Sequence, residues 1–201
     1  MPKEGIMPYG ILLCGLNGSG KSTLGYALAK AIGYTVLDAE DYYFPTQKES
    51  RLAALETDGK GDNCSDGKIP FTDPVPKAEV QHAVLADIGK TPNFILSGVK
   101  ADWNPQILAQ IAVVFHIITP PDVRAERIVS REVHRFGSRV LPGGDMYEGQ
   151  MQFRSFAAGR DETVVTDSFT GLDCPIITLD GTLSAAENVQ KIRKILAEIA
   201  G

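Results

Sequence analysis

The sequence contains few of the residues that build disulfide frameworks, metal sites or membrane spans. It has three cysteines and three histidines among 201 residues. The cysteines are far apart and odd in number, and neither residue type has metal-ligand spacing. No apolar run approaches the roughly 20 residues of a membrane helix, and Met1–Pro8 lacks the apolar core of a signal peptide. These absences predict a cytoplasmic protein with no membrane partner.

An excess of positive charge is also missing. The net charge is −5, and the hydrophobic content of 43% is ordinary for a soluble globular domain. A nucleic-acid partner is therefore not expected, and any phosphate site must come from a local cluster of basic side chains. The length suits one domain over residues 1–201, with a substantial core. Composition leaves open whether the protein is a monomer or a homodimer.

One segment carries a specific chemical signal. Residues 15–23 read Gly-Leu-Asn-Gly-Ser-Gly-Lys-Ser-Thr, and Gly15, Gly20, Lys21 and Ser22 fill the phosphate-binding-loop (Walker A) pattern. Glycines let backbone N–H groups turn toward a phosphate chain without Cβ collisions. The lysine reaches the β- and γ-phosphates, and the serine hydroxyl binds Mg²⁺, so ATP and Mg²⁺ are the predicted cofactors. The residues predicted to bind the nucleotide here are Gly15, Asn17, Gly18, Ser19, Gly20, Lys21, Ser22 and Thr23.

The residues on either side of this loop have the pattern that the motif requires. Residues 11–14 are an apolar run, as in a buried strand. Residues 24–32 repeat apolar side chains at helical spacing, and Gly33 provides a stop. Such a helix points its positive N-terminal end at a bound anion. The alternative is an ordinary glycine-rich turn between a strand and a helix.

Strand and helix patterns alternate along the rest of the chain. Nearly continuous apolar strands separated by helices imply a parallel sheet covered on both faces, so the predicted fold class is α/β. A capping-box pattern, Ser184 followed by Glu187, precedes the last helix. The expected remaining strands are 34–37, 94–96, 112–118 and 176–179, and the expected remaining helices are 80–88, 125–136 and 184–199.

Two segments interrupt this alternation. Residues 45–76 are polar and rich in Gly and Pro, which predicts an insertion that either covers the substrate or is disordered. Residues 137–153 contain Pro142-Gly143-Gly144 and few apolar side chains, so a second flap, or lid, is expected there.

Three acidic residues follow the second expected strand. Asp38, Glu40 and Asp41 lie where the carboxyl ends of parallel strands line a ligand crevice. A carboxylate there holds Mg²⁺ through water or accepts the proton of an attacking hydroxyl; the alternative is a solvated acidic turn. Asp38 is the first candidate for both roles, and Asp41 is the second candidate for catalysis. No acid follows the third strand directly, where Ser97 and Gly98 stand, so a conventional Walker B aspartate is missing.

Four arginines recur at helical spacing before the expected lid. Arg124, Arg127, Arg131 and Arg135 fall within about a quarter of the helix circumference. Such a stripe predicts a clamp that neutralises charge in phosphoryl transfer. The alternative is a solvated basic face paired with glutamates such as Glu132, and it carries more weight for Arg124 and Arg135. The residues expected on the opposite, apolar face are Ala125, Val129, Val133 and Phe136.

With these residues in place, the chain resembles the nucleoside-monophosphate-kinase-like group of P-loop proteins, which includes adenylate, cytidylate, shikimate and gluconate kinases. The resemblance runs from the phosphate-binding loop through the acidic strand end, residues 121–131, the lid and Arg160 to the last strand. It implies a P-loop NTPase sheet of five parallel strands in the order 2-3-1-4-5. It also implies that Arg127 and Arg131 bind nucleotide and phosphates. The residues that it implies beside the adenine are Asp180, Gly181 and Thr182.

The chain departs from adenylate kinases after the third strand. It has Ser97-Gly98-Val99-Lys100 in place of Asp-Gly-x-Pro-Arg. The acidic turn is more similar to that of shikimate and uridine kinases, in which an aspartate serves Mg²⁺ or the acceptor hydroxyl. Arg51 in the insertion is a candidate for an acceptor arginine. Residues 139–147 resemble bacterial P-loop proteins described only as ATPases or kinase-like, so the acceptor stays open.

The leading hypothesis is a kinase that transfers the ATP γ-phosphoryl group to a hydroxyl or phosphate of a small-molecule acceptor. Ser22 and Asp38 are the expected metal-binding residues, and Arg139 or Arg160 is expected to reach the site from the lid. The alternative is a nucleotide-dependent regulatory ATPase whose bound ATP orders the lid for a partner. The expected catalytic residues are Lys21, Asp38, Asp41, Arg127 and Arg131.

Overall fold

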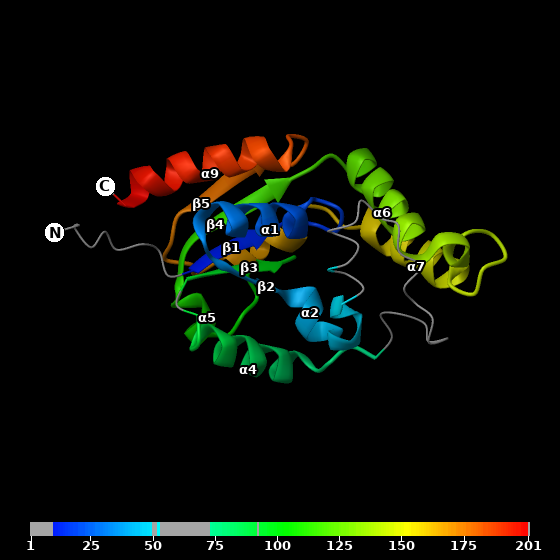
Figure 1. Cartoon of the computed structure of the whole chain (residues 1–201), viewed down its shortest axis with the longest axis horizontal. Helices are drawn as coiled ribbons and strands as arrows, with labels where there is room; N and C mark the ends of the chain where they lie inside the picture. The colour runs from blue at the N-terminus through cyan, green and yellow to red at the C-terminus, as the bar shows by residue number, and fades with distance from the viewer. Residues whose placement is uncertain (1–9, 50–51, 53–72, 92, 201) are drawn as a thin grey trace.

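A parallel sheet of five strands forms the centre of the molecule, in the order β2-β3-β1-β4-β5 (Figure 1). The computed structural model describes residues 10–49, 52, 73–91 and 93–200. The strand order and the parallel pairing confirm the predicted α/β fold of the P-loop kinases. The strands are β1 (Gly10–Cys14), β2 (Thr35–Asp38), β3 (Phe94–Gly98), β4 (Ile111–Ile118) and β5 (Ile176–Asp180).

Helices connect the strands and cover both faces of the sheet. The longer α-helices are α1 (Lys21–Ile32), α4 (Lys77–Ile88), α6 (Pro121–Phe136), α7 (Tyr147–Ala158) and α9 (Ala185–Ala200). The shorter α-helices are α2 (Ala39–Tyr43), α5 (Pro105–Leu108) and α8 (Thr163–Thr166), and the 3-10 turns are η1 (Pro45–Gln47), η2 (Gly137–Val140) and η3 (Asp167–Phe169).

The core lies in two layers, one on each face of the sheet. Along β1, Leu12 packs in a cluster with Val84 of α4, whereas its neighbour Leu13 packs with Leu28 of α1 and Ile192 of α9. Successive side chains of a strand point to opposite faces, so both layers need apolar residues and the strand has no polar position. Its four side chains, Ile11, Leu12, Leu13 and Cys14, are fully buried, and burial of each leucine or isoleucine stabilises the fold by about 1.5–3 kcal/mol. The faces are closed, so a ligand must bind at the edge of the sheet.

The helix ends follow the expected signals. Helix α1 ends at Gly33, whose φ of 75° favours glycine and whose N–H donates to Ala29 O at 2.8 Å. Before α9, the backbone N–H of Ser184 donates to Glu187 Oε2 at 2.9 Å, and the N–H of Glu187 donates back to Ser184 Oγ at 3.2 Å. This reciprocal pair is the predicted capping box.

The carboxyl ends of β1, β2 and β3 meet at one edge of the sheet. The strands run in register there, with Cys14 opposite Gly98 and Asp38 opposite Ser97. The phosphate-binding loop follows β1 directly, so it begins beside these residues. This edge brings together the loop, the acidic turn and the end of β3.

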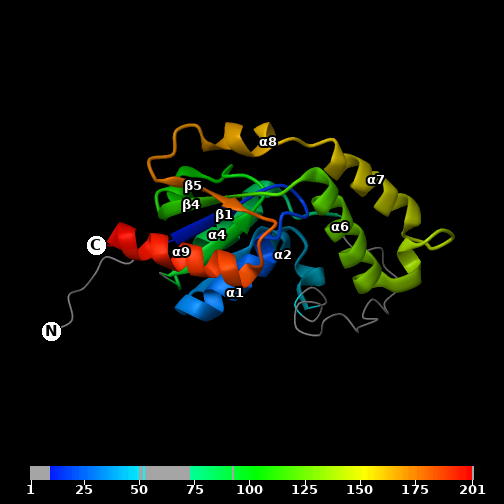
Figure 2. The ribbon, with the colours of Figure 1, turned by 90° about the horizontal axis from the view of Figure 1, so that it is seen from above.

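Residues 137–153, expected to be an irregular flap, are mostly helical, and their role as a lid stays a prediction. Helices α6 and α7 run side by side beyond the carboxyl ends of the strands (Figures 1 and 2). We call residues 121–158 the α6–α7 hairpin. Phe136, Val140 and Met146 form a small core at its tip. The apolar residues of this core come from three separate turns. They are too widely spaced along the sequence to form a periodic pattern, so the sequence did not predict the core.

The predicted apolar face of α6 is wrong for Ala125 and Val129, which are exposed, whereas Val133 and Phe136 pack in the core at the tip of the hairpin. Val129 is 39% exposed, whereas Arg124 is 3% and Glu132 is 2% exposed. The prediction assumed that α6 packs on the sheet. The helix instead packs against α7 and the phosphate-binding loop, and these neighbours offer carbonyl and amide groups to its polar side.

The predicted insertion at 45–76 falls mostly outside the described residues, and Arg51 lies outside them as well. Helix α2 leads into it, and η1 forms its first residues. Within the described ranges, no helix has both the length and the apolar composition needed to cross a membrane.

Candidate active site

The phosphate-binding loop has a backbone that requires glycine. Gly15, Gly18 and Gly20 have φ angles of 156°, 81° and 96°, which other residues adopt at a cost. Space is short as well, because a Cβ on Gly18 would lie 2.6 Å from Arg124 O. The loop is therefore held tightly against the first turns of α6.

Replacing Gly18 with Ala should weaken ATP binding by more than about tenfold, because the loop must move away from α6 and its N–H groups turn from the phosphates. The strained φ alone should destabilise the fold by about 2 kcal/mol. Calorimetric titration with ATP and thermal unfolding would measure both effects. Gly89→Ala is the matched control, because Gly89 has a φ of −60° and a Cβ there would meet nothing closer than 3.5 Å. Equal behaviour of the two variants would contradict the expectation.

Lys21 folds back across the loop. Its Nζ donates a hydrogen bond to Leu16 O at 3.0 Å. Burial lowers the pKa of Lys21 to about 8, although the nearby Asp38 carboxylate acts in the opposite direction. A bound phosphate chain would add negative charge and so favour the protonated ammonium.

ATP affinity should therefore fall as the pH rises through about 8, by up to about tenfold per pH unit. Binding then requires uptake of the proton that Lys21 has lost. Lys21 should have the opposite effect on the stability of the nucleotide-free protein, which should increase as the pH rises. Its pKa in the folded state lies below the ordinary value of 10.5, so the folded state binds fewer protons between these values and gains stability as the pH rises. Calorimetry in two buffers of different ionisation enthalpy would measure the uptake. In Lys21→Arg the uptake should disappear, because arginine stays charged.

The acidic turn divides its side chains between two sides of the molecule. Asp38 is buried and lines the main cavity, and its Oδ1 accepts a hydrogen bond from the Glu40 N–H at 3.0 Å, which caps α2. Asp41 instead lines a smaller cavity beside Tyr26 and Lys48. The structure thus does not bring Asp41 to the phosphate-binding loop, which corrects the sequence-based choice. Helix α2 begins at residue 39, and residues 40 and 41 point about 100° apart on a helix; Glu40 is the one that lines the main cavity.

Ser97 occupies the place where a Walker B aspartate was expected. Its side chain is 1% exposed, and its Oγ has no hydrogen-bond partner among the described residues. A buried hydroxyl left without a partner costs about 1–3 kcal/mol. Ser97 lines the cavity opposite Asp38, so a hydrated ion bound there would supply the missing partner.

The donor set fits Mg²⁺ rather than a metal held by protein ligands alone. Ser22 and Asp38 line the cavity together with Ser97, and oxygen donors with retained water are what Mg²⁺ prefers. Within the described part of the chain, no group of three or more His, Cys, Asp or Glu side chains is placed to hold a metal ion. Mg²⁺ would thus depend on the phosphates for part of its shell.

Four of the predicted arginines line the cavity wall, namely Arg127, Arg131, Arg135 and Arg160. Arg127 Nη1 donates to Gly181 O at 2.8 Å and so joins α6 to the loop after β5. Arg160 Nη1 donates to Asn17 Oδ1 at 3.1 Å, and Arg131 lines the same cavity. Arg139 does not line it. Its guanidinium is held by the carboxylate of Asp145, with Nη2–Oδ2 at 2.7 Å.

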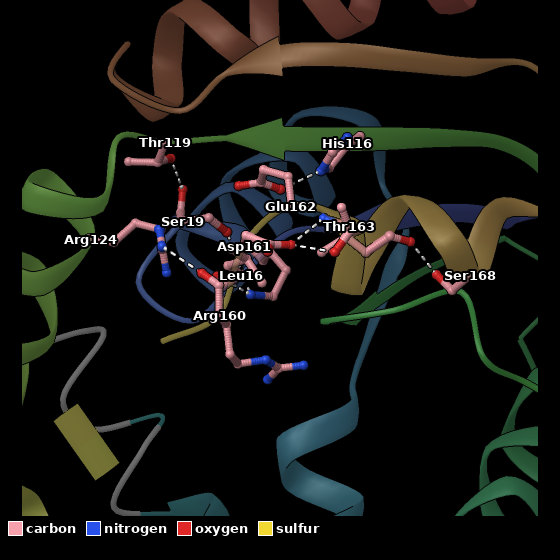
Figure 3. A network of polar contacts seen from close by, with 12 residues as sticks. Leu16, Ser19, His116, Thr119, Arg124, Arg160, Asp161, Glu162, Thr163 and Ser168 are labelled. Carbon is pink, nitrogen blue, oxygen red and sulfur yellow. Dashed lines mark hydrogen bonds and ion pairs between the residues drawn. The ribbon is translucent and has the colours of Figure 1, made fainter. Parts of the chain in front are cut away.

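Arg124 has neither of the predicted roles, because it is internal and binds backbone carbonyls. It donates to the carbonyl oxygens of Asn17, Ala157 and Arg160, each at 3.4 Å. Figure 3 shows Arg124 next to the Arg160 backbone at the end of the hairpin. No carboxylate pairs with it among the described residues. Burial and the charge of Arg124 lower the pKa of Arg160, and a bound anion would offset both effects.

The loop after β5 places one of its three predicted residues on the cavity. Gly181 lines the wall, and a Cβ there would overlap the Thr119 side chain. Asp180 and Thr182 are exposed and bond to each other, with Thr182 N donating to Asp180 Oδ1 at 2.8 Å. Asn188 of α9 also lines the cavity, and its Oδ1 is buried without a partner among the described residues. Asn188 could not be predicted from the sequence, because an asparagine within a helix has no distinguishing pattern.

These residues surround a single large cavity of about 1020 Å³. Ligand pockets usually measure about 300–1,000 Å³, so this cavity is at the upper end of the usual range. The aromatic and basic side chains that also line it are Tyr43, Phe44, Lys77, Lys100, Trp103, His134 and Phe153.

A family model described as AAA domain matches residues 11–139, more than half of the chain. The match includes the phosphate-binding loop, Asp38, Ser97 and the arginines of α6. The chain belongs to this family. Within it, this P-loop protein has the predicted nucleotide-kinase and shikimate-kinase type of fold.

The relatives of this P-loop protein are kinases and one uncharacterized protein. Uncharacterized protein YqaC of Bacillus subtilis (strain 168) is 27% identical in an alignment of 199 residues that covers 95% of this chain and 99% of YqaC. Cytidylate kinase of Methanococcoides burtonii is 28% identical over 130 residues, 65% of this chain and 67% of the kinase. A solved gluconokinase from Sinorhizobium meliloti 1021 has a TM-score of 0.52 at 19% identity, over 96% of this chain and 94% of that one; this likeness concerns the fold.

Proposed function

We propose that this protein transfers the γ-phosphoryl group of Mg-ATP to a hydroxyl or phosphate of a small-molecule acceptor. The observation that carries the proposal is the convergence of Lys21, Asp38 and four arginines on one cavity of about 1020 Å³. A protein that only binds nucleotide needs the loop, but it has no need for a carboxylate and a cationic wall around further space. The kinase relatives support the same reading.

The roles of the residues follow from the course of the reaction. The acceptor oxygen forms a bond to the γ-phosphorus, and the bond from this phosphorus to the β,γ-bridging oxygen breaks and leaves ADP. Lys21 would hold the β- and γ-phosphates, while Arg127, Arg131 and Arg160 would stabilise the charge on the transferred group. Asp38 would orient a hydroxyl acceptor and take its proton.

Mg²⁺ would be held by Ser22 and, through water, by Asp38 and Ser97. When bound, it neutralises charge on the β- and γ-phosphates. Glu40 lies on the cavity wall where the sequence suggested Asp41, but it meets Arg135 Nη1 at 3.8 Å. We assign Glu40 to the acceptor side of the site, where its ion pair would orient rather than deprotonate a substrate.

The test is ADP release from Mg-ATP, first alone and then with nucleosides, nucleoside monophosphates, sugar acids, sugars and hydroxy acids. Turnover that one acceptor class stimulates, with a phosphorylated product seen by mass spectrometry, supports the proposal. Slow turnover that no acceptor changes, with ATP binding demonstrated, contradicts it.

A second function is a nucleotide-dependent regulatory ATPase. The observation in its favour is the outer face of α7, where Phe156 and Met151 are exposed. Phe156 stacks under the guanidinium of Arg160 at 5.1 Å, and Arg160 contacts the phosphate-binding loop. A partner on this face would sense the nucleotide, and its binding to the protein should then depend on ATP.

A further inference from the structure

Arg131 and Glu132 make a contact that their spacing does not favour. Consecutive residues of a helix point about 100° apart and ordinarily do not face each other. Here Arg131 Nε and Nη2 both meet Glu132 Oε1, at 2.8 and 2.6 Å. Arg131 lines the cavity with its side chain 40% exposed, whereas the side chain of Glu132 is 2% exposed. The arginine thus folds back over a buried carboxylate on the cavity wall.

The second oxygen of Glu132 reaches the other arm of the hairpin. Gln150 Nε2 of α7 donates to Glu132 Oε2 at 3.3 Å, and Gln150 is buried as well. A buried carboxylate is costly unless its oxygens are paired, and Arg131 and Gln150 pair one oxygen each. The contacts form a continuous link from α7 through Glu132 to a guanidinium on the cavity wall.

We propose that Glu132 is a positioning residue, which holds the guanidinium of Arg131 for the transferred phosphoryl group and connects its orientation to α7 through Gln150. Glu132 uses the Nε edge of the guanidinium. Arg131 Nη1 has no hydrogen bond to any described residue, and this nitrogen remains for a phosphate oxygen. The inference rests on the proposed phosphoryl transfer and adds a residue that the sequence analysis named only in its alternative, a solvated basic face.

The charge of Glu132 excludes a simpler account, in which it merely strengthens the positive field. A carboxylate beside Arg131 reduces the net charge that a phosphate meets. Its benefit must therefore be geometric, because a fixed guanidinium loses less side-chain freedom when the phosphoryl group passes through its transition state. The rival account, that Glu132 sequesters Arg131 from the site, predicts an effect of opposite sign.

The experiment compares the affinity of MgADP with that of MgADP plus aluminium fluoride, an analogue of the transferred phosphoryl group, by calorimetry on the full chain. We expect Glu132→Gln to reduce the preference for the analogue by roughly 10- to 100-fold, with the MgADP affinity within about twofold of wild type. Gln150→Leu should give a smaller reduction of the same kind. Glu126→Gln is the control, because Glu126 is exposed on the same helix and lies outside the cavity wall; it should match wild type.

The Arg131→Ala background separates positioning from a general effect on the fold. If Glu132 acts through Arg131, Glu132→Gln should cause less than about a twofold further loss in that background. The proposal would be overturned if Glu132→Gln reduced the preference for the analogue as much in the Arg131→Ala background as in the wild type. It would also be overturned if Glu132→Gln alone left that preference unchanged or increased it. Thermal unfolding of each variant identifies a loss caused by misfolding, and Gln150→Leu then provides the second test of the same link.

Failure of the proposed function has a different signature. A wild-type protein that binds MgADP with and without aluminium fluoride equally well has no phosphoryl-transfer site to position, and that result overturns both proposals. A wild type that prefers the analogue, beside a Glu132→Gln variant with the same preference, overturns only the role of Glu132.

Discussion

Lys21→Ala will reduce phosphoryl transfer by at least about 10³-fold, while the protein keeps its fold. Loss of one well-placed cationic donor to a developing charge usually costs a factor of 10²–10³, and Lys21 serves two phosphates. The fold should survive because the buried ammonium does not stabilise it. Burial lowers the pKa of Lys21 to about 8, and this shift means that the folded state disfavours the charge.

The measurement pairs acceptor-stimulated ADP release with thermal unfolding. Lys30→Ala is the matched control, because Lys30 is an exposed lysine in the last turn of the same helix. We expect Lys30→Ala to retain wild-type transfer. Full activity in Lys21→Ala would remove the phosphate-binding role of the loop, and a loss of thermal stability comparable to that of a core substitution would show that the ammonium supports the fold.

The sequence predicted the sheet because its three central strands, β1, β3 and β4, are buried on both faces. A strand such as β4 then has apolar residues at almost every position, and this run is legible without knowledge of its neighbours. The phosphate-binding loop was equally legible, since Gly15, Gly18 and Gly20 have positive φ angles that a short local pattern encodes. Both signals are local, so one sequence is enough to find them.

The α6–α7 hairpin could not be predicted in the same way, because it packs polar residues on polar partners. Arg124 satisfies carbonyl groups that lie 33 and 36 residues away along the chain, and Glu132 meets Gln150 of the other arm. A helical wheel places these polar side chains on the side that faces water. Only the folded chain reveals that carbonyl and amide groups take the place of water.

Asp38→Asn will lower the rate of transfer to a hydroxyl acceptor by about 10²–10⁴-fold, the range for loss of a general base. The fold should be retained, because Asn caps a helix about as well as Asp. The substituted side chain can still accept the hydrogen bond from the Glu40 N–H that begins α2. Asp38 is buried in the cavity wall, so removal of its charge should affect the site and leave the rest of the fold unchanged.

The dependence on Mg²⁺ separates the two roles of Asp38. If the carboxylate mainly holds hydrated Mg²⁺, excess Mg²⁺ should restore much of the rate, because the ion keeps Ser22 and the phosphates. If it mainly takes the acceptor proton, saturating Mg²⁺ should leave the deficit unchanged, and the rate should no longer depend on ionisation of the carboxylate. Asp41→Asn should have no effect on either measurement, since Asp41 lines a different cavity. A loss in Asp41→Asn equal to that in Asp38→Asn would contradict this assignment and return the acidic turn to two catalytic carboxylates.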